Sequence, residues 1–462
     1  MRTGAPVYSV PMYAPVILPS EWQEPASVLA GLAHEDYAVG LISDGSVKRG
    51  RWSYVAARPD EVLSVDGEEG RDPFSALSIL IGSSVGADRS FDPDLPPFQG
   101  GVIGLASYEL GARSEPVDLA RSQGWPDLVC ARYCSLLAFD HLHRKLYAVG
   151  CGFNGLEAAD MALSWLTLPR PPIFQGRLAQ SFDAAASHGA YEANVATVVK
   201  KIEAGEIFQA NIAQSWQGQL RSGATPADLI ERLIAASPAP FAGYVKLPGR
   251  AVVSNSPERF ISIQAGKPRL AQTRPIKGTA PRGGDLQADQ ALAANLRESL
   301  KDRAENLMIV DLMRNDLARV CVPGTVRTPE LFEVETFTNV HHLVSTVVGE
   351  LVAGVDAGEV LRATYPPGSI SGAPKVQAMR VISQLEPPRG PYCGVLFWAG
   401  FEGGFDSSVL IRTVALVEDA EGWSFEVRAG AGIVADSDPA SERLETEHKI
   451  SAIRAALLGG EP

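Results

Sequence analysis

Two acidic residues and a lysine near the C-terminus have the spacing of one helical face. Glu442, Glu445 and Lys449 are three and four residues apart, so a helix would point all three side chains in one direction. Hard divalent cations such as Mg²⁺ take oxygen ligands and keep waters that a substrate oxyanion can replace. Glu305, in another predicted helix, could add a carboxylate. By spacing alone, a solvated helix face with a Glu445–Lys449 ion pair is the simpler interpretation.

Three further residue types in the chain could carry catalysis. Lys277 follows a proline-stiffened stretch and precedes a glycine, and a lysine in a desolvated pocket can lose its proton and become a nucleophile. Glu258 is a candidate general acid if burial raises its pKa, although pairing with Arg259 is the alternative. His342 could orient or transfer a proton. Its neighbour His341 would face another way, so a structural role for either histidine stays open.

Small residues mark two places where backbone can approach a ligand closely. The segment GSISGAPK, residues 368–375, places Ser371 and free backbone N–H groups at a predicted helix start, which suits an anion. Gly430 and Gly432 form the second place. Neither segment has a Walker pattern or a G-x-G-x-x-G after a strand, so nucleotide binding is not indicated. Taken alone, the two features are more simply a helix cap and a turn.

Several elements must position these residues. Apolar residues at helical spacing from Tyr191 predict a helix that ends near Gly205. Residues 207–216 read as a strand with Gln209, Asn211 and Ala213 on one face. Further predicted elements are a hairpin over 135–139 and 146–149, a long helical region over 292–310, a helix over 374–385, strands over 409–417 and 423–427, and a last helix over about 439–458. This pattern predicts an α+β fold with large antiparallel sheets.

Length and charge bound the function. The chain has 462 residues with 41 basic and 54 acidic side chains, a net charge of −13, which argues against a nucleic-acid binder. No run of about 18 apolar residues predicts a membrane span. The N-terminus, with Pro6 and Pro11, lacks the apolar core of a secretory signal, so we expect a cytoplasmic protein.

Five scattered cysteines indicate neither a disulfide framework nor a zinc site and are expected to be small buried hydrophobes. Prolines at 169, 171 and 172 mark the clearest break along the chain.

Together these segments closely resemble the chorismate-utilising enzymes, and within them the large subunits of aminodeoxychorismate synthases. The motifs that carry the resemblance are IFQANIAQ, SPERF, TRPIKGT, AENLMIVDLMRNDLARV, HHLVSTVVGEL, PPGSISGAPKVQAM, LIRTVAL and GAGIVADSDPASERLETEHK, with weaker likeness in GRWSYVAARP and PFQGGVIGLASYE. The resemblance implies an α/β/β/α body of two stacked antiparallel sheets flanked by helices. An N-terminal region, 1–168, and a chorismate-binding region, 185–455, would both belong to that body.

The resemblance also implies roles for individual residues. It assigns Mg²⁺ ligation to Glu305 and Glu445, with Glu442 adjacent, so that the metal neutralises the ring carboxylate of chorismate and helps its C4 hydroxyl leave. The positions that match substrate-binding residues are Tyr392, Arg412, Gly430, Gly432, Lys449 and Ser371. His342 matches the family's active-site histidine.

Lys277 and Gln209 distinguish the branches of the family. The resemblance implies that Lys277 adds at C2 of chorismate as the C4 hydroxyl leaves with Glu258 as general acid, after which ammonia attacks C4. Anthranilate synthases usually have alanine at this lysine position, and isochorismate synthases usually have a water-activating lysine where this chain has Gln209. The combination of Lys277 and Gln209 therefore favours amination at C4 of chorismate. An anthranilate synthase large subunit is the nearest alternative, and a catalytically silent chorismate-binding subunit is an alternative from another class.

The sequence differs from related enzymes in two ways, and each difference leads to an expectation. The segment Leu41-Ile42-Ser43-Asp44-Gly45 lacks the leucine-leucine-glutamate-serine pattern of tryptophan-inhibited anthranilate synthases, so strong feedback inhibition by tryptophan is not expected. Nothing in the sequence resembles a glutamine amidotransferase or a lyase. Ammonia would therefore come from a separate amidotransferase subunit or from solution, and the product would be aminodeoxychorismate rather than p-aminobenzoate.

Overall fold

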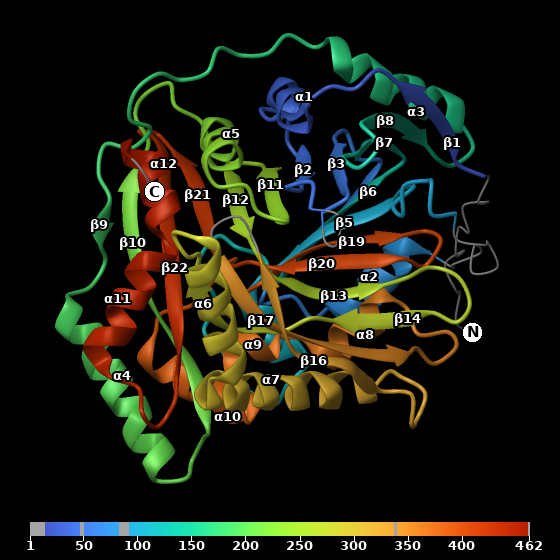
Figure 1. Cartoon of the computed structure of the whole chain (residues 1–462). Coiled ribbons are helices and arrows are strands. Elements are labelled where there is room, and N and C mark those ends of the chain that lie inside the picture. The colour runs from blue at the N-terminus through green and yellow to red at the C-terminus, as the bar shows by residue number, and fades with distance from the viewer. Residues whose placement is uncertain (1–13, 47–49, 83–91, 337–339, 461–462) are drawn as a thin grey trace.

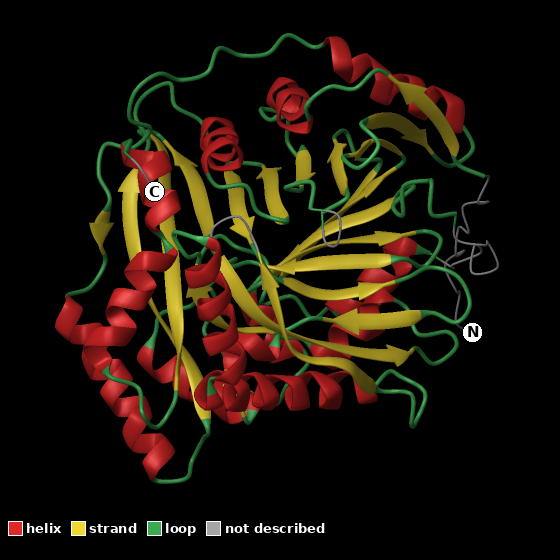
Figure 2. Cartoon of the chain, viewed as in Figure 1, coloured by secondary structure: helices red, strands yellow, loops and turns green. Residues whose placement is uncertain are grey.

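Two antiparallel sheets and their flanking helices form the protein (Figures 1 and 2). The computed structural model describes residues 14–46, 50–82, 92–336 and 340–460. The segment with Pro6 and Pro11, on which the expected location was based, lies outside these ranges. In the described ranges, no helix is long and apolar enough to cross a membrane.

The first sheet combines strands from both sides of the proline break. In spatial order its strands are β1 (Val16–Ser20), β8 (Lys145–Gly150), β7 (Ser135–Asp140), β3 (Trp52–Ala56), β2 (Val39–Ile42), β11 (Phe241–Leu247), β12 (Arg250–Ser256), β21 (Thr413–Asp419), β22 (Gly422–Ile433), β10 (Gln209–Gln219) and β18 (Gly372–Ala373), with β9 (Asp183–Ala184) also paired to β10. Neighbouring β2 and β11 come from opposite sides of the break and share four register pairs, from Ile42 opposite Ala242 to Val39 opposite Val245.

The second sheet is also antiparallel and mixes the two parts of the chain. Its strands are β15 (Ile276–Pro281), β17 (Val340–Glu350), β14 (Leu270–Thr273), β13 (Arg259–Ile263), β20 (Phe405–Val409), β19 (Val395–Gly400), β5 (Gly101–Ala106), β6 (Leu128–Tyr133) and β4 (Glu61–Val65), with β16 (Arg327–Thr336) also paired to β17. The chain crosses from this sheet to the first one between β6 and β7.

Helices cover the outer faces of the two sheets. The helices are α1 (Pro25–Leu32), α2 (Pro73–Ile81), α3 (Gly155–Ser164), α4 (His188–Glu203), α5 (Pro226–Ala236), α6 (Leu286–Glu298), α7 (Leu300–Ala318), α8 (Ala357–Thr364), α9 (Gly368–Ser371), α10 (Lys375–Leu385), α11 (Pro439–Lys449) and α12 (Ser451–Leu458), with short 3₁₀ turns at Tyr108–Arg113 and Trp165–Thr167. Figure 1 shows α1, α3 and α5 above the first sheet and α7 below the second.

Three apolar layers hold this stack together, because each sheet buries both faces. Between the sheets, Tyr54 and Val252 of the first pack with Leu105, Leu396 and Trp398 of the second. A second layer joins the first sheet to α1, α3, α5 and α12, and a third joins the second sheet to α2, α7, α8 and α10. The predicted α/β/β/α architecture is confirmed.

Some elements differ from the sequence-based expectation at single residues. The predicted helical region 292–310 is two helices, because Ser299 has extended backbone and its hydroxyl caps α7 through the Asp302 N–H at 3.2 Å. The last predicted helix divides into α11 and α12 at Ile450. The predicted strand 409–417 is broken before β21, where Arg412 has a left-handed φ of 50°. The hairpin of β7 and β8 and the helix end at Gly205, with φ of 77°, are confirmed.

Candidate active site

Most of the predicted site residues line one cavity of about 680 Å³. Its walls come from β10 and β22 of the first sheet, β15 and β17 of the second sheet, and helices α7, α9 and α11. The predicted residues on its wall are Glu258, Lys277, Glu305, His342, Tyr392, Arg412, Gly430, Gly432, Glu442, Glu445 and Lys449. Residues from eight separate stretches of sequence therefore meet around one space of ligand size.

Lys277 on β15 faces the first sheet across the cavity. Its Nζ donates a hydrogen bond to Glu305 Oε2 of α7 at 2.8 Å. On the other side, a Cβ at Gly432 would lie 2.7 Å from this Nζ and 2.8 Å from Gln209 Nε2. Any side chain at position 432 would displace one of the two groups, so the glycine permits their close approach.

Gln209 is fully buried at the start of β10 beside Lys277. Neither its amide oxygen nor its amide nitrogen has a hydrogen-bond partner among the described residues. An unpaired buried amide is costly, which makes it a candidate for contact with a ligand. Asn211 on the same strand also has a buried, unpaired side-chain oxygen, and Asn211 lies on the cavity wall.

The acidic residues of α11 point into the cavity with the lysine of the same face. Lys449 Nζ forms an ion pair with Glu445 Oε1 at 2.6 Å and donates to the Gly430 carbonyl at 2.9 Å. Burial raises the pKa of Glu442, against the hydrogen bond that Ser437 donates to it at 2.6 Å. Burial also acts on Glu445, but nearby Lys449 outweighs it and lowers the pKa of Glu445. The α11 spacing thus makes one charged face, as the sequence indicated.

Three carboxylates border the cavity without forming a closed cluster. Glu305 is paired with Lys277, Glu445 with Lys449, and Glu442 with Ser437. Within the described ranges, no group of three or more His, Cys, Asp or Glu side chains is close enough to hold a metal ion. The site therefore offers oxygen ligands that already have protein partners.

Glu258 and His342 also lie on the cavity wall. Glu258 is 8% exposed in the turn between β12 and β13, while its neighbour Arg259 forms a two-bond ion pair with Asp406 at 2.8 and 2.9 Å. His342 Nδ1 lies 2.9 Å from the Thr279 hydroxyl, opposite it in the β15–β17 register. His341 points to the other side of β17, as neighbours on a strand must.

Arg412 and Tyr392 supply a cation and a hydroxyl. The left-handed backbone at Arg412 turns the chain between β20 and β21, and burial lowers the pKa of its guanidinium. Among the described residues, its guanidinium has no hydrogen-bond or ion-pair partner, and it lines the cavity. Burial raises the pKa of Tyr392 well above its usual value, so its hydroxyl stays neutral. A partly buried guanidinium fork open to a cavity is suited to a carboxylate ligand.

Ser371 does not lie on the cavity wall. It is fully buried at the end of α9, and its hydroxyl donates to the Pro367 carbonyl at 3.0 Å. The segment predicted as a helix start forms α9 and the short strand β18, which pairs with β10, before α10 begins. Ser369 and Ile370 border the cavity instead. The predicted substrate contact of Ser371 therefore has no counterpart in this geometry.

Sequence reasoning missed several polar residues on the wall. They are Thr279, Lys301, Asp302, Arg428 and His448. Thr279 and His448 lie inside the motifs already singled out, so their neighbours were a usable signal. Lys301 and Asp302 follow the Ser299 break, and only a prediction of that break would have placed them at the start of α7.

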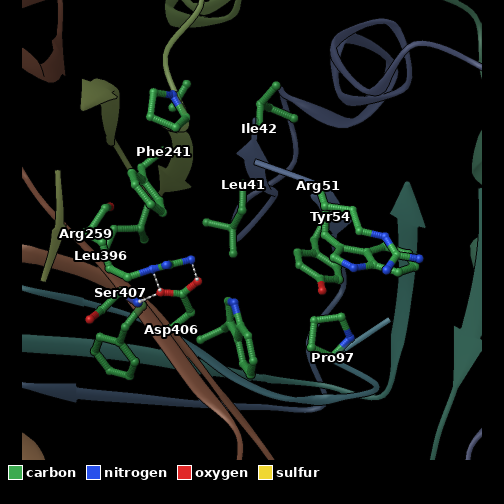
Figure 3. A pocket seen from close by; sticks show the side chains of 16 residues that line it. Leu41, Ile42, Arg51, Tyr54, Pro97, Phe241, Arg259, Leu396, Asp406 and Ser407 are labelled. Atoms are coloured by element: carbon green, nitrogen blue, oxygen red, sulfur yellow. Dashed lines mark hydrogen bonds and ion pairs between the residues drawn. The ribbon is translucent and has the colours of Figure 1, made fainter. Parts of the chain in front are cut away.

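A second cavity of about 210 Å³ lies between the sheets (Figure 3). Leu41 and Ile42 of the LISDG segment line it, and Figure 3 shows Leu41 pointing into the space between Phe241 and Tyr54. Ser43 of the same segment is buried, and its hydroxyl donates to the Gly50 carbonyl. Two residues of the segment used for the tryptophan expectation therefore line a separate cavity, whose wall also includes Arg51, Arg259 and Asp406.

Comparison with known proteins gives the class of this fold and site. The family of chorismate binding enzymes matches residues 45–455, and the chain belongs to this family. It is 43% identical over 366 residues to aminodeoxychorismate synthase component 1 of Salmonella typhimurium, covering 78% of this chain and 77% of the relative. It is 36% identical to the Escherichia coli protein of that name, covering 96% and 99%.

Relatives with another name are also similar. Anthranilate synthase component 1 of Streptomyces coelicolor is 38% identical, covering 95% of this chain and 87% of the relative. Among solved structures, anthranilate synthase component I from Streptococcus pneumoniae superposes with a TM-score of 0.75 at 28% identity, covering 88% and 92% of the two chains. The Escherichia coli isochorismate synthase MenF, at 18% identity and a TM-score of 0.73 with 96% and 94% covered, shares the fold.

Proposed function

We propose that the chain is the large subunit of an aminodeoxychorismate synthase, which converts chorismate and ammonia to 4-amino-4-deoxychorismate. The observation that carries this proposal is the placement of Lys277, whose amine lies beside Gln209 and Glu305 at the cavity. The relatives of that name at 36–43% identity support it. Anthranilate synthase component 1 relatives keep C2 amination as the alternative.

Two cations on the cavity wall, Arg412 and Lys449, suit a substrate with two carboxylates. Arg412 presents an unpaired fork from the β20–β21 turn, and Tyr392 presents a neutral hydroxyl near Gly430. Lys449 lies on the α11 side, held by the Gly430 carbonyl. We assign the carboxylates of chorismate to these groups, because charge-assisted hydrogen bonds from a guanidinium are strong and directional.

We propose that Glu305 and Glu445 would hold Mg²⁺, with Glu442 adjacent. Their carboxylates fit this ion, because Mg²⁺ is usually bound through one or two carboxylates together with waters and substrate oxygens. When bound, the ion would supply positive charge against a substrate carboxylate and a departing hydroxyl. Removal of divalent cations with EDTA should abolish turnover, and added Mg²⁺ should restore it; full activity in excess EDTA would contradict this assignment.

The protein side chains can account for the exchange at C4. After losing a proton, the amine of Lys277 would bond to C2 of chorismate as both ring double bonds shift along the ring and the C4 hydroxyl leaves. Glu258, on the cavity wall, would donate the proton that converts this hydroxyl to water. Ammonia would then bond to C4, and the reverse shift would break the bond from C2 to Lys277. We propose that a glutamine amidotransferase partner supplies this ammonia.

A product assay tests the proposal. The purified chain is incubated with chorismate, Mg²⁺ and ammonium at mildly alkaline pH, and products are separated with and without added aminodeoxychorismate lyase. We expect p-aminobenzoate only when the lyase is present. Fluorescent anthranilate without the lyase would establish C2 amination instead, and no product of either kind would favour a silent binding subunit.

Replacement of the nucleophile distinguishes the two routes further. Lys277→Ala should reduce C4 amination by about 100-fold or more, since covalent catalysis by this amine is lost. Lys200→Ala, on the exposed side of α4, is the matched control and should leave turnover unchanged. Little loss in Lys277→Ala would reduce Lys277 to an electrostatic role. A cytoplasmic location remains part of this proposal, and fractionation of cells that express the chain would test it.

A further inference from the structure

Two of the five cysteines face one another at the corner where the chain passes between the sheets. Cys134 lies between β6 and β7, directly before Ser135, which pairs with Gly150 of β8. Cys151 directly follows Gly150, and its backbone N–H donates to the Cys134 carbonyl at 2.9 Å. The Cys151 thiol donates to the carbonyl of Tyr133, the residue before Cys134, at 3.8 Å. The pair therefore continues the β7–β8 ladder by one step.

This position is compatible with a disulfide. Directly opposed residues of a hydrogen-bonded antiparallel pair have Cα atoms about 5.5 Å apart. Disulfides join Cα atoms about 4.4–6.8 Å apart, so the backbone would need little movement. Gly100 keeps room for the buried sulfur, because a Cβ there would lie 2.5 Å from Cys151 Sγ. The other cysteines, Cys130, Cys321 and Cys393, are buried.

The two thiols differ in their surroundings. Cys134 is partly exposed, whereas Cys151 is buried. The nearby Cys151 thiol, with help from the Arg132 guanidinium, lowers the pKa of Cys134 against the effects of burial and of the Asp60 carboxylate. The same contact, followed by burial, raises the pKa of Cys151. Redox-active cysteine pairs commonly combine one accessible thiolate with an adjacent resolving thiol.

We propose that Cys134 and Cys151 are a peroxide-oxidisable dithiol that closes reversibly to a disulfide. The Cys134 thiolate attacks one oxygen of the peroxide, which breaks the O–O bond, forms a sulfenic acid and, after protonation, releases water. The Cys151 sulfur then attacks the sulfenic sulfur, forms the S–S bond and releases a second water. Two thiols are oxidised and one hydrogen peroxide is reduced to two waters. A dithiol reductant reverses the step.

The disulfide would connect the β6–β7 corner to the end of β8. This corner joins the two sheets, since β6 lies in one and β7 in the other. The cross-link would close a short loop around the β7–β8 hairpin and restrict the unfolded chain. We therefore expect the oxidised protein to melt at a higher temperature than the reduced protein.

Peptide mapping of the full chain tests this inference independently of turnover. The reduced protein is treated with hydrogen peroxide, residual thiols are alkylated, and a non-reducing digest is analysed by mass spectrometry. We expect a peptide pair linked through Cys134 and Cys151 that disappears with dithiothreitol. Cys134→Ser should abolish it, and Cys130→Ser, a buried cysteine on β6, should retain it.

Two outcomes would overturn the proposal. One is that the wild-type chain forms the linked peptide only after denaturation. The other is that peroxide converts Cys134 to sulfinic acid without any link to Cys151. Alkylation of the untreated native protein gives a second measurement, with Cys134 expected to react before the other four cysteines. Preferential labelling of a buried cysteine would also contradict the proposed reactivity.

Discussion

A buried ion pair beneath the cavity gives the most quantitative prediction. Arg389 donates to both carboxylate oxygens of Glu386 at 3.0 Å, and the two side chains are 1% and 3% exposed. Arg389 also donates to the carbonyls of Asn211 at 2.7 Å and Ile370 at 3.2 Å. Glu386 accepts the backbone N–H of Ala213 at 2.7 Å. The pair therefore joins β10 to α9, which both border the cavity.

Replacing Glu386 by glutamine keeps its shape but removes its charge. The buried guanidinium of Arg389 then lacks a counter-ion, and one amide N–H₂ of the new side chain faces its N–H donors. Removal of one partner from a buried pair costs about 3–5 kcal/mol of unfolding free energy. Unfolding entropy is about 2.1 cal/mol/K per residue, so cooperative unfolding of this chain has an entropy of about 1 kcal/mol/K. We expect Tm to fall by about 3–5 °C.

The assay is thermal unfolding followed by circular dichroism, with calorimetry to check cooperativity. Glu206→Gln is the matched control, because Glu206 forms an exposed 2.9 Å pair with Lys201 that contributes about 0–1 kcal/mol. Its Tm should change by about 1 °C or less. If Glu386→Gln melts within the range of this control, the energetic argument for the buried pair is refuted.

Three further predictions concern ligands, pH and substrate affinity. Added tryptophan should not inhibit turnover strongly, because the LISDG segment differs from the inhibited pattern. Burial acts to raise the pKa of Asp140, but Arg51 and His143 outweigh it and lower this pKa to about 2. Ionised Asp140 should therefore contribute about 2 kcal/mol to the free energy of unfolding above about pH 4, and this contribution is lost as the pH falls through 2. In urea unfolding at several pH values, Asp140→Asn should remove this pH dependence. Arg412→Lys should raise KM for chorismate about 10-fold or more with a smaller effect on kcat, since lysine lacks the planar fork.

Each of these predictions has a contradicting result. Potent inhibition by tryptophan would contradict the expectation drawn from the changed segment. An unchanged acid limb of the unfolding free energy in Asp140→Asn would mean that its pairs are not formed in solution. An unaltered KM in Arg412→Lys would exclude the guanidinium fork as a carboxylate ligand, while Arg428→Lys serves as a control on the same wall.

Local spacing was sufficient for parts of the site that lie on one element. Glu442, Glu445 and Lys449 share a face because the helix repeat places i, i+3 and i+7 together. The adjacent histidines diverge because a strand alternates its faces, which left only His342 at the cavity. Lys277 was also recognisable from its own segment, because a proline-stiffened stretch precedes it and a glycine follows it.

Breaks in the elements were harder to read from the sequence. The interruptions at Ser299 and Ile450 leave the apolar periodicity nearly intact, so periodicity alone predicted continuous helices. Arg412 adopts a left-handed φ that sequence patterns rarely indicate for a non-glycine residue. Ser371 looked like part of an anion-binding helix start, but its hydroxyl bonds within α9.

Sequence by itself determined the α+β class, the helical face of α11 and the identities of the candidate acids, bases and cations. Only the tertiary structure decided that Lys277 lies beside Gln209 and Glu305 and that Arg412 opens onto the same cavity. The physical reason is that a local repeat sets the direction of side chains along one element. Distances between elements depend on strand register and sheet packing, which are set by contacts among residues far apart in the chain.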